Sequence, residues 1–130
     1  MEKRIYYHDT DAGGVVYYGR YLNYLEEART EFLEQRGLSV EEFQKKGNLY
    51  AVRQCTIIYR SPARYGEILS CTAELKKMTA AQLIFAQKII EKSTDRLIVE
   101  AEVNLVCLTL DFKPSALPED MRAKLSAAIS

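Results

Sequence analysis

The residues with the clearest chemical potential are Asp9 and Asp11, in the segment Asp-Thr-Asp-Ala-Gly-Gly that separates an aromatic N-terminal stretch from a long amphipathic one. Glycine adopts positive φ at low cost and aspartate hydrogen-bonds its own backbone, so this composition predicts a tight loop. Free backbone N–H groups and a positive dipole end mark the start of a following helix. A carboxylate beside such donors suits attack on a carbonyl group whose oxyanion the donors stabilise.

Other interpretations of the two aspartates remain open. Asp11 also suits a helix cap or the closure of a turn, and Asp9 is better explained as a turn residue. The spacing begins like a calcium-binding loop, but that pattern requires Asp or Asn at position 13 and Glu at position 20, where this chain has Gly13 and Arg20. We therefore predict no metal site.

The elements that must position this loop follow from the spacing of apolar residues. Residues 3–8 are rich in Tyr and Ile, which predicts a strand, and the loop takes residues 9–16. From about Tyr17 the period becomes helical, so a long helix is expected over residues 17–36, ending at Gly37. Its apolar stripe is Tyr21, Leu22, Leu25, Ala28, Phe32 and Leu33.

The rest of the chain is read as one short helix, a series of strands and a C-terminal helix. Ser39 and Glu42 form a capping-box pattern, which predicts a helix over residues 40–46 that ends at Gly47. Strands are expected over residues 49–60, 68–78, 80–92 and 96–110, the last with Leu97, Val99, Ala101, Val103, Leu105 and Cys107 on one face. Pro118 opens the last helix, with Met121, Leu125 and Ile129 on its apolar side.

This order of elements predicts an α+β fold over one domain, residues 1–130. Short connections favour antiparallel pairing, and one helix on one face of a sheet makes two layers. The expected strands, of about 10–14 residues, are longer than the usual 5–6. Because long antiparallel strands curl, we expect a curled antiparallel sheet wrapped around the one long helix.

Composition excludes several classes of protein. Lys plus Arg and Asp plus Glu both number 18, so no global field favours nucleic acid or an anionic membrane. Cys55, Cys71 and Cys107 are odd in number and far apart, which is typical of reduced core residues in a cytoplasmic protein. No apolar run approaches the ~20 residues of a membrane helix, and no signal peptide is recognised.

The chain resembles the hotdog-fold acyl-CoA thioesterases of the 4-hydroxybenzoyl-CoA thioesterase type, especially the Tol-Pal-associated short-chain branch. The positions that carry this resemblance are Arg4-Ile5, Thr10-Asp11, Gly14–Tyr17, Tyr21, Glu26, Ala28, Arg29, Tyr59–Glu67 and Pro114. The Tol-Pal-associated branch usually has a His where this chain has Tyr18, and a Tyr at this position is more similar to the hydroxybenzoyl branch.

The resemblance implies a hotdog fold, dimers with joined sheets that often pair into tetramers, and active sites between protomers. It makes Asp11 the catalytic carboxylate and the backbone amide of Tyr18 the group that polarises the thioester carbonyl. Substrate contacts are expected at Tyr7, Gly14, Val15, Arg60, Ser61 and Arg64. The two arginines suit coenzyme A phosphates because the guanidinium fork matches phosphate oxygens, although a solvated rim explains them equally well.

The predicted activity is hydrolysis of a small acyl- or aroyl-CoA thioester without a cofactor, coenzyme A being part of the substrate. Asp11 either attacks the thioester directly, giving a mixed anhydride, or deprotonates a water molecule, and both routes stay open. An acyl carrier protein is a further possible partner. A non-catalytic acyl-thioester binder is the alternative, whereas a dehydratase needs a His in the site and His8 lies on the wrong side of the loop.

Overall fold

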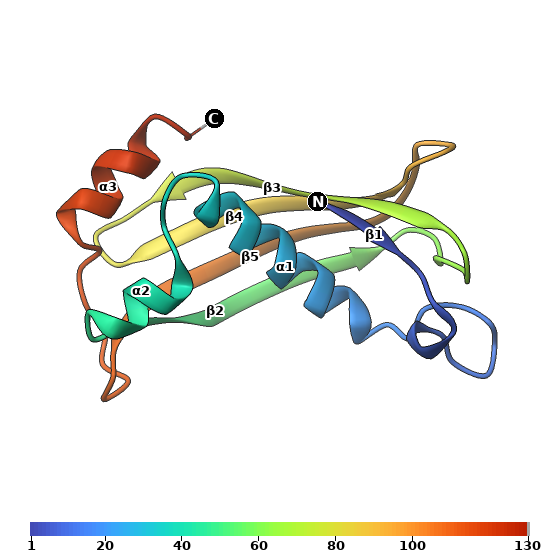
Figure 1. Ribbon diagram of the computed structural model, residues 1–130, viewed down its shortest axis with the longest axis horizontal. Helices are drawn as coiled ribbons and strands as arrows, with labels where there is room; N and C mark the ends of the chain where they lie inside the picture. The colour runs from blue at the N-terminus through green and yellow to red at the C-terminus, as the bar shows by residue number, and fades with distance from the viewer. Residues whose placement is uncertain (130) are drawn as a thin grey trace.

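The computed structural model describes residues 1–129, and an antiparallel sheet in the order β1-β3-β4-β5-β2 dominates it (Figure 1). The strands are β1 (Glu2–Arg4), β2 (Asn48–Tyr59), β3 (Ile68–Met78), β4 (Gln82–Glu91) and β5 (Arg96–Thr109). The helices are α1 (Arg20–Glu34), α2 (Val40–Lys45) and α3 (Glu119–Ser126), and a short 3-10 turn, η1, spans Tyr7–Asp9.

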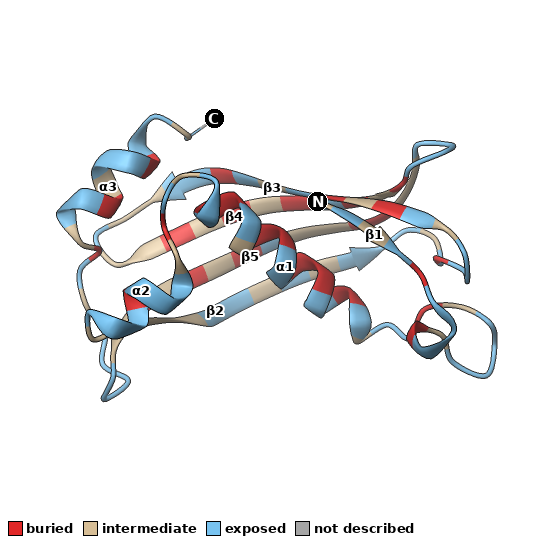
Figure 2. Cartoon of the chain, in the orientation of Figure 1, coloured by how far each residue is buried: buried red, intermediate tan, exposed pale blue. Residues whose placement is uncertain are grey.

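The sheet curls, and α1 lies across its inner face (Figure 1). The buried positions of α1 follow the side of the helix that faces the sheet, as Figure 2 shows. Phe32 of α1 meets Phe85 of β4 edge to face, with ring centroids 5.4 Å apart. Burying an aromatic or aliphatic side chain of this size stabilises the fold by about 1.5–3 kcal/mol. The expected α+β arrangement of a curled sheet around one long helix is therefore confirmed.

The predicted N-terminal strand over residues 3–8 is too long. Pairing with β3 stops at Arg4, and the chain turns through η1 at Tyr7–Asp9. The reason is Asp9, whose carboxylate accepts a hydrogen bond from the amide of Tyr6 at 2.9 Å while its own amide donates to the Tyr6 carbonyl. Side-chain competition of this kind favours turns over strands.

The long helix is shorter than predicted at both ends. It begins at Arg20 rather than near Tyr17, because the amide of Tyr17 donates to the Asp9 carbonyl at 3.1 Å and holds residue 17 in the loop. It ends at Glu34, and Gly37 follows with the positive φ of 74° that suits a residue beyond a helix end. Leu22 is 49 % exposed, so its place in the apolar stripe is wrong; Tyr24 is buried instead.

Two further expectations about faces need correction. A register shift in the β4–β5 pairing leaves Ile98 and Val99 both buried, whereas Leu97 is only half-buried. A bulge of this kind breaks the alternation on which the prediction rested. At the C-terminus α3 ends at Ser126, so Ile129 lies beyond the helix and is exposed, although Met121 and Leu125 are buried as expected.

The sheet has two unlike edges. β1 pairs with β3 over only three residues, whereas the other edge is the whole of β2, 12 residues long, which pairs with β5 alone. Val52, Ile58 and Tyr59 on β2 are exposed hydrophobic residues.

In the described part of the chain, no helix combines the length and the apolar character needed to cross a membrane.

Candidate active site

Asp11 lies at the corner of a turn that its own carboxylate helps to close. Its Oδ1 accepts a hydrogen bond from the Gly13 amide at 2.8 Å, and its carbonyl accepts from Gly14 at 3.0 Å. Gly14 has φ of 77°, a left-handed conformation that glycine adopts without strain. The second carboxylate oxygen has no hydrogen bond within residues 1–129, and the residue is exposed. The carboxylate is thus oriented by the turn yet accessible.

Asp9, two residues earlier, is the buried carboxylate, with 2 % of its surface exposed. Burial raises the pKa of Asp9, but the Tyr6 amide, the Tyr24 hydroxyl and the nearby charges of His8 and Lys3 outweigh that effect, so the pKa lies below its ordinary value. The imidazole of His8 stands 3.7 Å from the Asp9 carboxylate. Asp9 is therefore a charged anchor for η1, in keeping with its interpretation as a turn residue.

The start of α1 offers unused backbone donors. Within residues 1–129, neither the Tyr18 amide nor the Gly19 amide donates a hydrogen bond. These amides precede a helix of 15 residues, whose dipole adds positive potential at this end. The predicted oxyanion donor at Tyr18 therefore has a free N–H group in the right kind of environment.

A hollow of about 310 Å³ lies beside these amides. It is lined by Val16, Tyr18, Tyr21, Tyr59, Arg60, Ser61 and Pro62. The Tyr18 ring is 65 % exposed and meets Tyr59 of β2 edge to face, with centroids 6.2 Å apart. The hollow thus has an aromatic wall next to the start of α1. Asp11 belongs to the adjoining loop but does not line this hollow.

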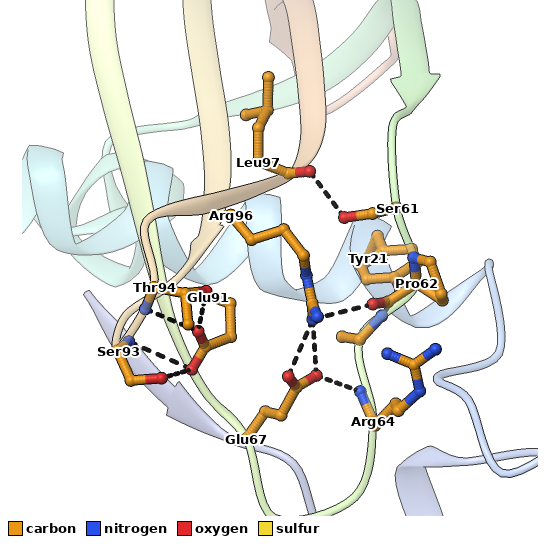
Figure 3. Close-up of polar contacts among 11 residues, drawn as sticks. Tyr21, Ser61, Pro62, Arg64, Glu67, Glu91, Ser93, Thr94, Arg96 and Leu97 are labelled. Carbon is orange, nitrogen blue, oxygen red and sulfur yellow. Dashed lines mark hydrogen bonds and ion pairs between the residues drawn. The ribbon is translucent and has the colours of Figure 1, made fainter.

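The segment after β2 is fixed to the site by contacts over long sequence distances (Figure 3). The amide of Ala63 donates to the Tyr21 hydroxyl at 3.1 Å, and the Val16 amide donates to the Ala63 carbonyl at 2.8 Å. Arg96 of β5 donates to both carboxylate oxygens of Glu67, at 2.9 and 2.8 Å. Both of these bonds come from the same nitrogen, Nη2, and the opposite charges of the two groups make them stronger than neutral hydrogen bonds. The loop that carries Asp11, α1 and this segment are held as one unit.

The structure brings most of the predicted substrate contacts together, but some of their side chains already have polar partners within the chain and others do not. Val15 pairs with Arg64 in an isolated bridge, next to the hollow. Arg60 is in an ion pair with Glu100 at 2.9 Å, and the Ser61 hydroxyl donates to the Leu97 carbonyl at 2.7 Å. The Arg64 guanidinium has no ion-pair partner within residues 1–129. Of the two arginines, Arg64 is the better candidate for a phosphate.

Tyr7 is the predicted contact that stands apart from the hollow. Its ring is 81 % exposed and lies edge to face against Tyr65, with centroids 6.4 Å apart. Because Tyr65 follows Arg64 directly, Tyr7 belongs to the outer rim of the site.

Sequence reasoning missed a second cavity, of about 440 Å³, between α1, α2 and β2. Apolar side chains such as Leu33, Val40 and Leu49 line it together with Glu26 and Arg29 of α1. The signal in the sequence was an arginine, Arg29, within the apolar stripe of the long helix, and one charged residue in such a stripe does not by itself indicate a cavity.

Comparison with known proteins adds independent information. A family model described as the thioesterase-like superfamily matches residues 6–125. The acyl-CoA thioester hydrolase YbgC of Escherichia coli O157:H7 is 39% identical over 122 residues, which cover 93% of this chain and 90% of that protein. The acyl-CoA thioesterase YbgC of Haemophilus influenzae is 33% identical and covers 92% of this chain and 88% of its own.

Among solved structures, Slr0204, a 1,4-dihydroxy-2-naphthoyl-CoA thioesterase from Synechocystis, superposes with a TM-score of 0.89. It is 24% identical, and the match covers 97% of this chain and 93% of that chain. At this identity the likeness speaks for the fold alone, and it confirms the expected hotdog fold.

Proposed function

Since this chain belongs to the thioesterase-like superfamily, we propose that it hydrolyses the thioester bond of a small acyl- or aroyl-coenzyme A, with Asp11 as the catalytic carboxylate. The family membership confirms the resemblance found in the N-terminal motif and the expectation of a thioester hydrolase. The observation that carries the proposal is the pairing of a turn-oriented, accessible carboxylate with free amides at Tyr18 and Gly19.

The chemistry follows from these two parts. The thioester carbonyl oxygen accepts a hydrogen bond from the Tyr18 amide, and this donor strengthens as the oxygen gains negative charge. Asp11 either attacks the carbonyl carbon or removes a proton from the attacking water. The carbon–sulfur bond then breaks and the thiolate leaves as free coenzyme A. On the general-base route the acyl group has already taken up the water and leaves as a carboxylate. On the nucleophilic route it stays on Asp11 as a mixed anhydride, which a water molecule hydrolyses to release the carboxylate and restore Asp11. Little assistance to the leaving group is needed because a thiolate is stable.

The proposed site is completed by a second protomer. β2 is a long edge strand with exposed hydrophobic residues, and such an edge invites pairing with another chain. Antiparallel pairing of β2 with its own copy around a two-fold axis places the Tyr59 end of one strand beside the Asn48 end of the other. The hollow next to Tyr18 then adjoins the 440 Å³ cavity of the partner protomer, and the Asp11 loop lies at their junction.

Mass measurement by light scattering tests this assembly. We expect a dimer, or a tetramer built from two dimers, of the 14.9 kDa chain. A monomer at micromolar concentration that still hydrolyses acyl-CoA would rule out the two-protomer site.

The activity itself is tested by thiol release from a panel of acyl-CoAs. Asp11→Asn keeps the hydrogen bond from Gly13 but removes the charge, and we expect turnover to fall by roughly 10²–10⁴, the usual contribution of such a group. Glu102→Gln, an exposed carboxylate in the middle of β5, is the control and should retain full activity. Equal rates in wild type and Asp11→Asn would remove Asp11 from the mechanism.

The alternative function, a non-catalytic binder of acyl thioesters, predicts saturable binding with no thiol release. An acyl carrier protein presents the same thioester on a phosphopantetheine arm, so an acylated carrier belongs in the same panel.

The three cysteines are free thiols, which supports a reducing, cytoplasmic location.

A further inference from the structure

The cavity between α1, α2 and β2 contains an arginine whose charge is not neutralised. Arg29 is 8 % exposed, and its Nη1 donates to Oε1 of Gln87 on β4 at 2.9 Å. No carboxylate within residues 1–129 lies at ion-pair distance from it; Glu26, one turn earlier on α1, is exposed. Burial lowers the pKa of Arg29, and Glu26 only partly opposes this.

The orientation of Gln87 is fixed by its other contacts. Its Nε2 donates to the carbonyl of Leu25 at 3.0 Å and to that of Thr72 at 3.2 Å. Because both amide hydrogens are engaged, the amide oxygen must face Arg29. Gln87 therefore presents one neutral acceptor to a guanidinium that carries five N–H donors. Gln87 thus holds the Arg29 side chain in place but leaves its positive charge without a counter-charge and most of its N–H donors without an acceptor within residues 1–129.

A buried, unpaired cation is costly, and arginine is rarely buried without a partner. Arg29 also lines the cavity, whose other walls combine apolar and polar residues. The apolar ones are Leu33, Val40, Leu49, Tyr50, Val52 and Leu105, and the polar ones are Glu26, Thr30, Gln44 and Asn48. The guanidinium fork is suited to bind oxygen acceptors, and a carboxylate most of all. We propose that this cavity receives the acyl group of the substrate, and that Arg29 selects acyl groups that carry an acceptor oxygen away from the thioester.

This inference rests on the proposed function and on its two-protomer site. The cavity lies at the Asn48–Val52 end of β2, and the hollow beside Tyr18 lies at the Tyr59 end. In an antiparallel pair of β2 strands these ends are neighbours. The thioester then sits at the Asp11 loop of one protomer while the acyl group extends toward Arg29 of the other.

The test compares acyl-CoAs of equal chain length that differ in oxygen content: butyryl-, 3-hydroxybutyryl- and succinyl-CoA. In the wild type we expect kcat/KM for at least one oxygen-bearing substrate to exceed that for butyryl-CoA by about tenfold or more, as sites built to hydrogen-bond a substrate group discriminate against analogues that lack it. In Arg29→Met this ratio should fall to near one, with the butyryl-CoA rate little changed.

Arg36→Met is the control, because Arg36 follows the end of α1, where it packs on Phe32 and donates to the Phe32 carbonyl. It should keep the wild-type ratio. Arg29→Lys keeps the charge without the fork, and we expect it to retain part of the preference; it also replaces the Met variant if that protein does not fold. Light scattering must give the same mass for all of these variants.

Binding gives a readout that does not depend on turnover. Calorimetric titration of Asp11→Asn and of Asp11→Asn with Arg29→Met, using the same three acyl-CoAs, should show the preference in the first protein and its loss in the second. A wild-type preference for butyryl-CoA, an equal loss for all three substrates in Arg29→Met, or a changed mass in that variant would overturn the inference. Absence of thiol release from every substrate would instead overturn the proposed function.

Discussion

The Oδ1 atom of Asp11 accepts a hydrogen bond from the Gly13 amide at 2.8 Å, and a Cβ atom at residue 13 would lie 3.3 Å from that same oxygen. The close approach means that the position of the carboxylate depends on the absence of a side chain at residue 13. The adjacent Gly14 is needed for a different reason. A Cβ atom at residue 14 would have no neighbour within 4 Å, so space is not the constraint there; the constraint is the backbone φ of 77°.

Gly13→Ala should therefore impair catalysis more than stability. The added methyl group displaces the Asp11 carboxylate by a few tenths of an ångström, and since misplacement by about 1 Å can cost 10²-fold in rate, we expect a loss of about tenfold in turnover. Thiol-release kinetics and urea unfolding of the same preparation measure the two effects.

Gly14→Ala is the contrasting variant. An alanine in the left-handed region costs about 1–2 kcal/mol, so we expect this change in the free energy of unfolding. Unaltered turnover in Gly13→Ala together with normal stability in Gly14→Ala would contradict our account of the turn.

Tyr21→Phe tests the link between α1 and the segment after β2. The Tyr21 hydroxyl is the acceptor for the buried amide of Ala63, at 3.1 Å. Leaving a buried donor unpaired costs about 1–3 kcal/mol, so we expect the free energy of unfolding to fall by that amount. The measurement is equilibrium denaturation in urea.

Tyr18→Phe serves as its control, because the Tyr18 side chain is exposed and its ring contacts do not need the hydroxyl. Stability should be unchanged. Turnover should also be retained, since the proposed role of Tyr18 in the reaction belongs to its backbone amide. A large loss of turnover in this variant would assign the hydroxyl a part in catalysis.

Glu91 should make stability depend on pH in acid. Hydrogen bonds from the hydroxyls of Ser93 and Thr94, each 2.6 Å long, and then from their amides lower the pKa of Glu91 to about 2, against the opposing effect of burial. The folded state thus favours the charged carboxylate. The stabilisation that the charged Glu91 carboxylate gives to the folded state is complete above pH 4.5, the ordinary pKa, and is lost as pH falls from there through about 2.

Urea unfolding of wild type and Glu91→Gln at pH 7, 4 and 2.5 checks this expectation. The variant should be less stable at pH 7, and the difference should shrink steadily as pH falls. If the difference in unfolding free energy between wild type and Glu91→Gln stays constant from pH 7 to 2.5, the charge of Glu91 is not what stabilises the turn at Ser93 and Thr94.

Local features of the fold were predictable because their causes lie within a few residues. The Ser39 hydroxyl accepts the hydrogen bond from the Glu42 amide, at 3.1 Å, that the capping pattern indicated. Gly37 follows the long helix with the expected positive φ. Alternation likewise placed Val103, Leu105 and Cys107 on one face of the strand at 96–110, and all three are buried.

Features that depend on long-range packing were not predictable in this way. Leu97 and Leu22 both fit an apolar pattern, yet a bulge in the β4–β5 pairing and the burial of Tyr24 decided their exposure. The functional roles given to Asp11, Tyr18 and the rim residues remain predictions, supported by their placement at one end of the fold.

The sequence by itself determined the family, the curled two-layer fold and the turn that carries Asp11, because hydrophobic period and turn chemistry act over short stretches of chain. Only the tertiary structure decided which of two nearly adjacent aspartates is buried, and only it brought Arg29 to Gln87 across 58 residues. Burial and charge pairing depend on neighbours that arrive from distant parts of the chain, and no local pattern encodes where those neighbours will stand.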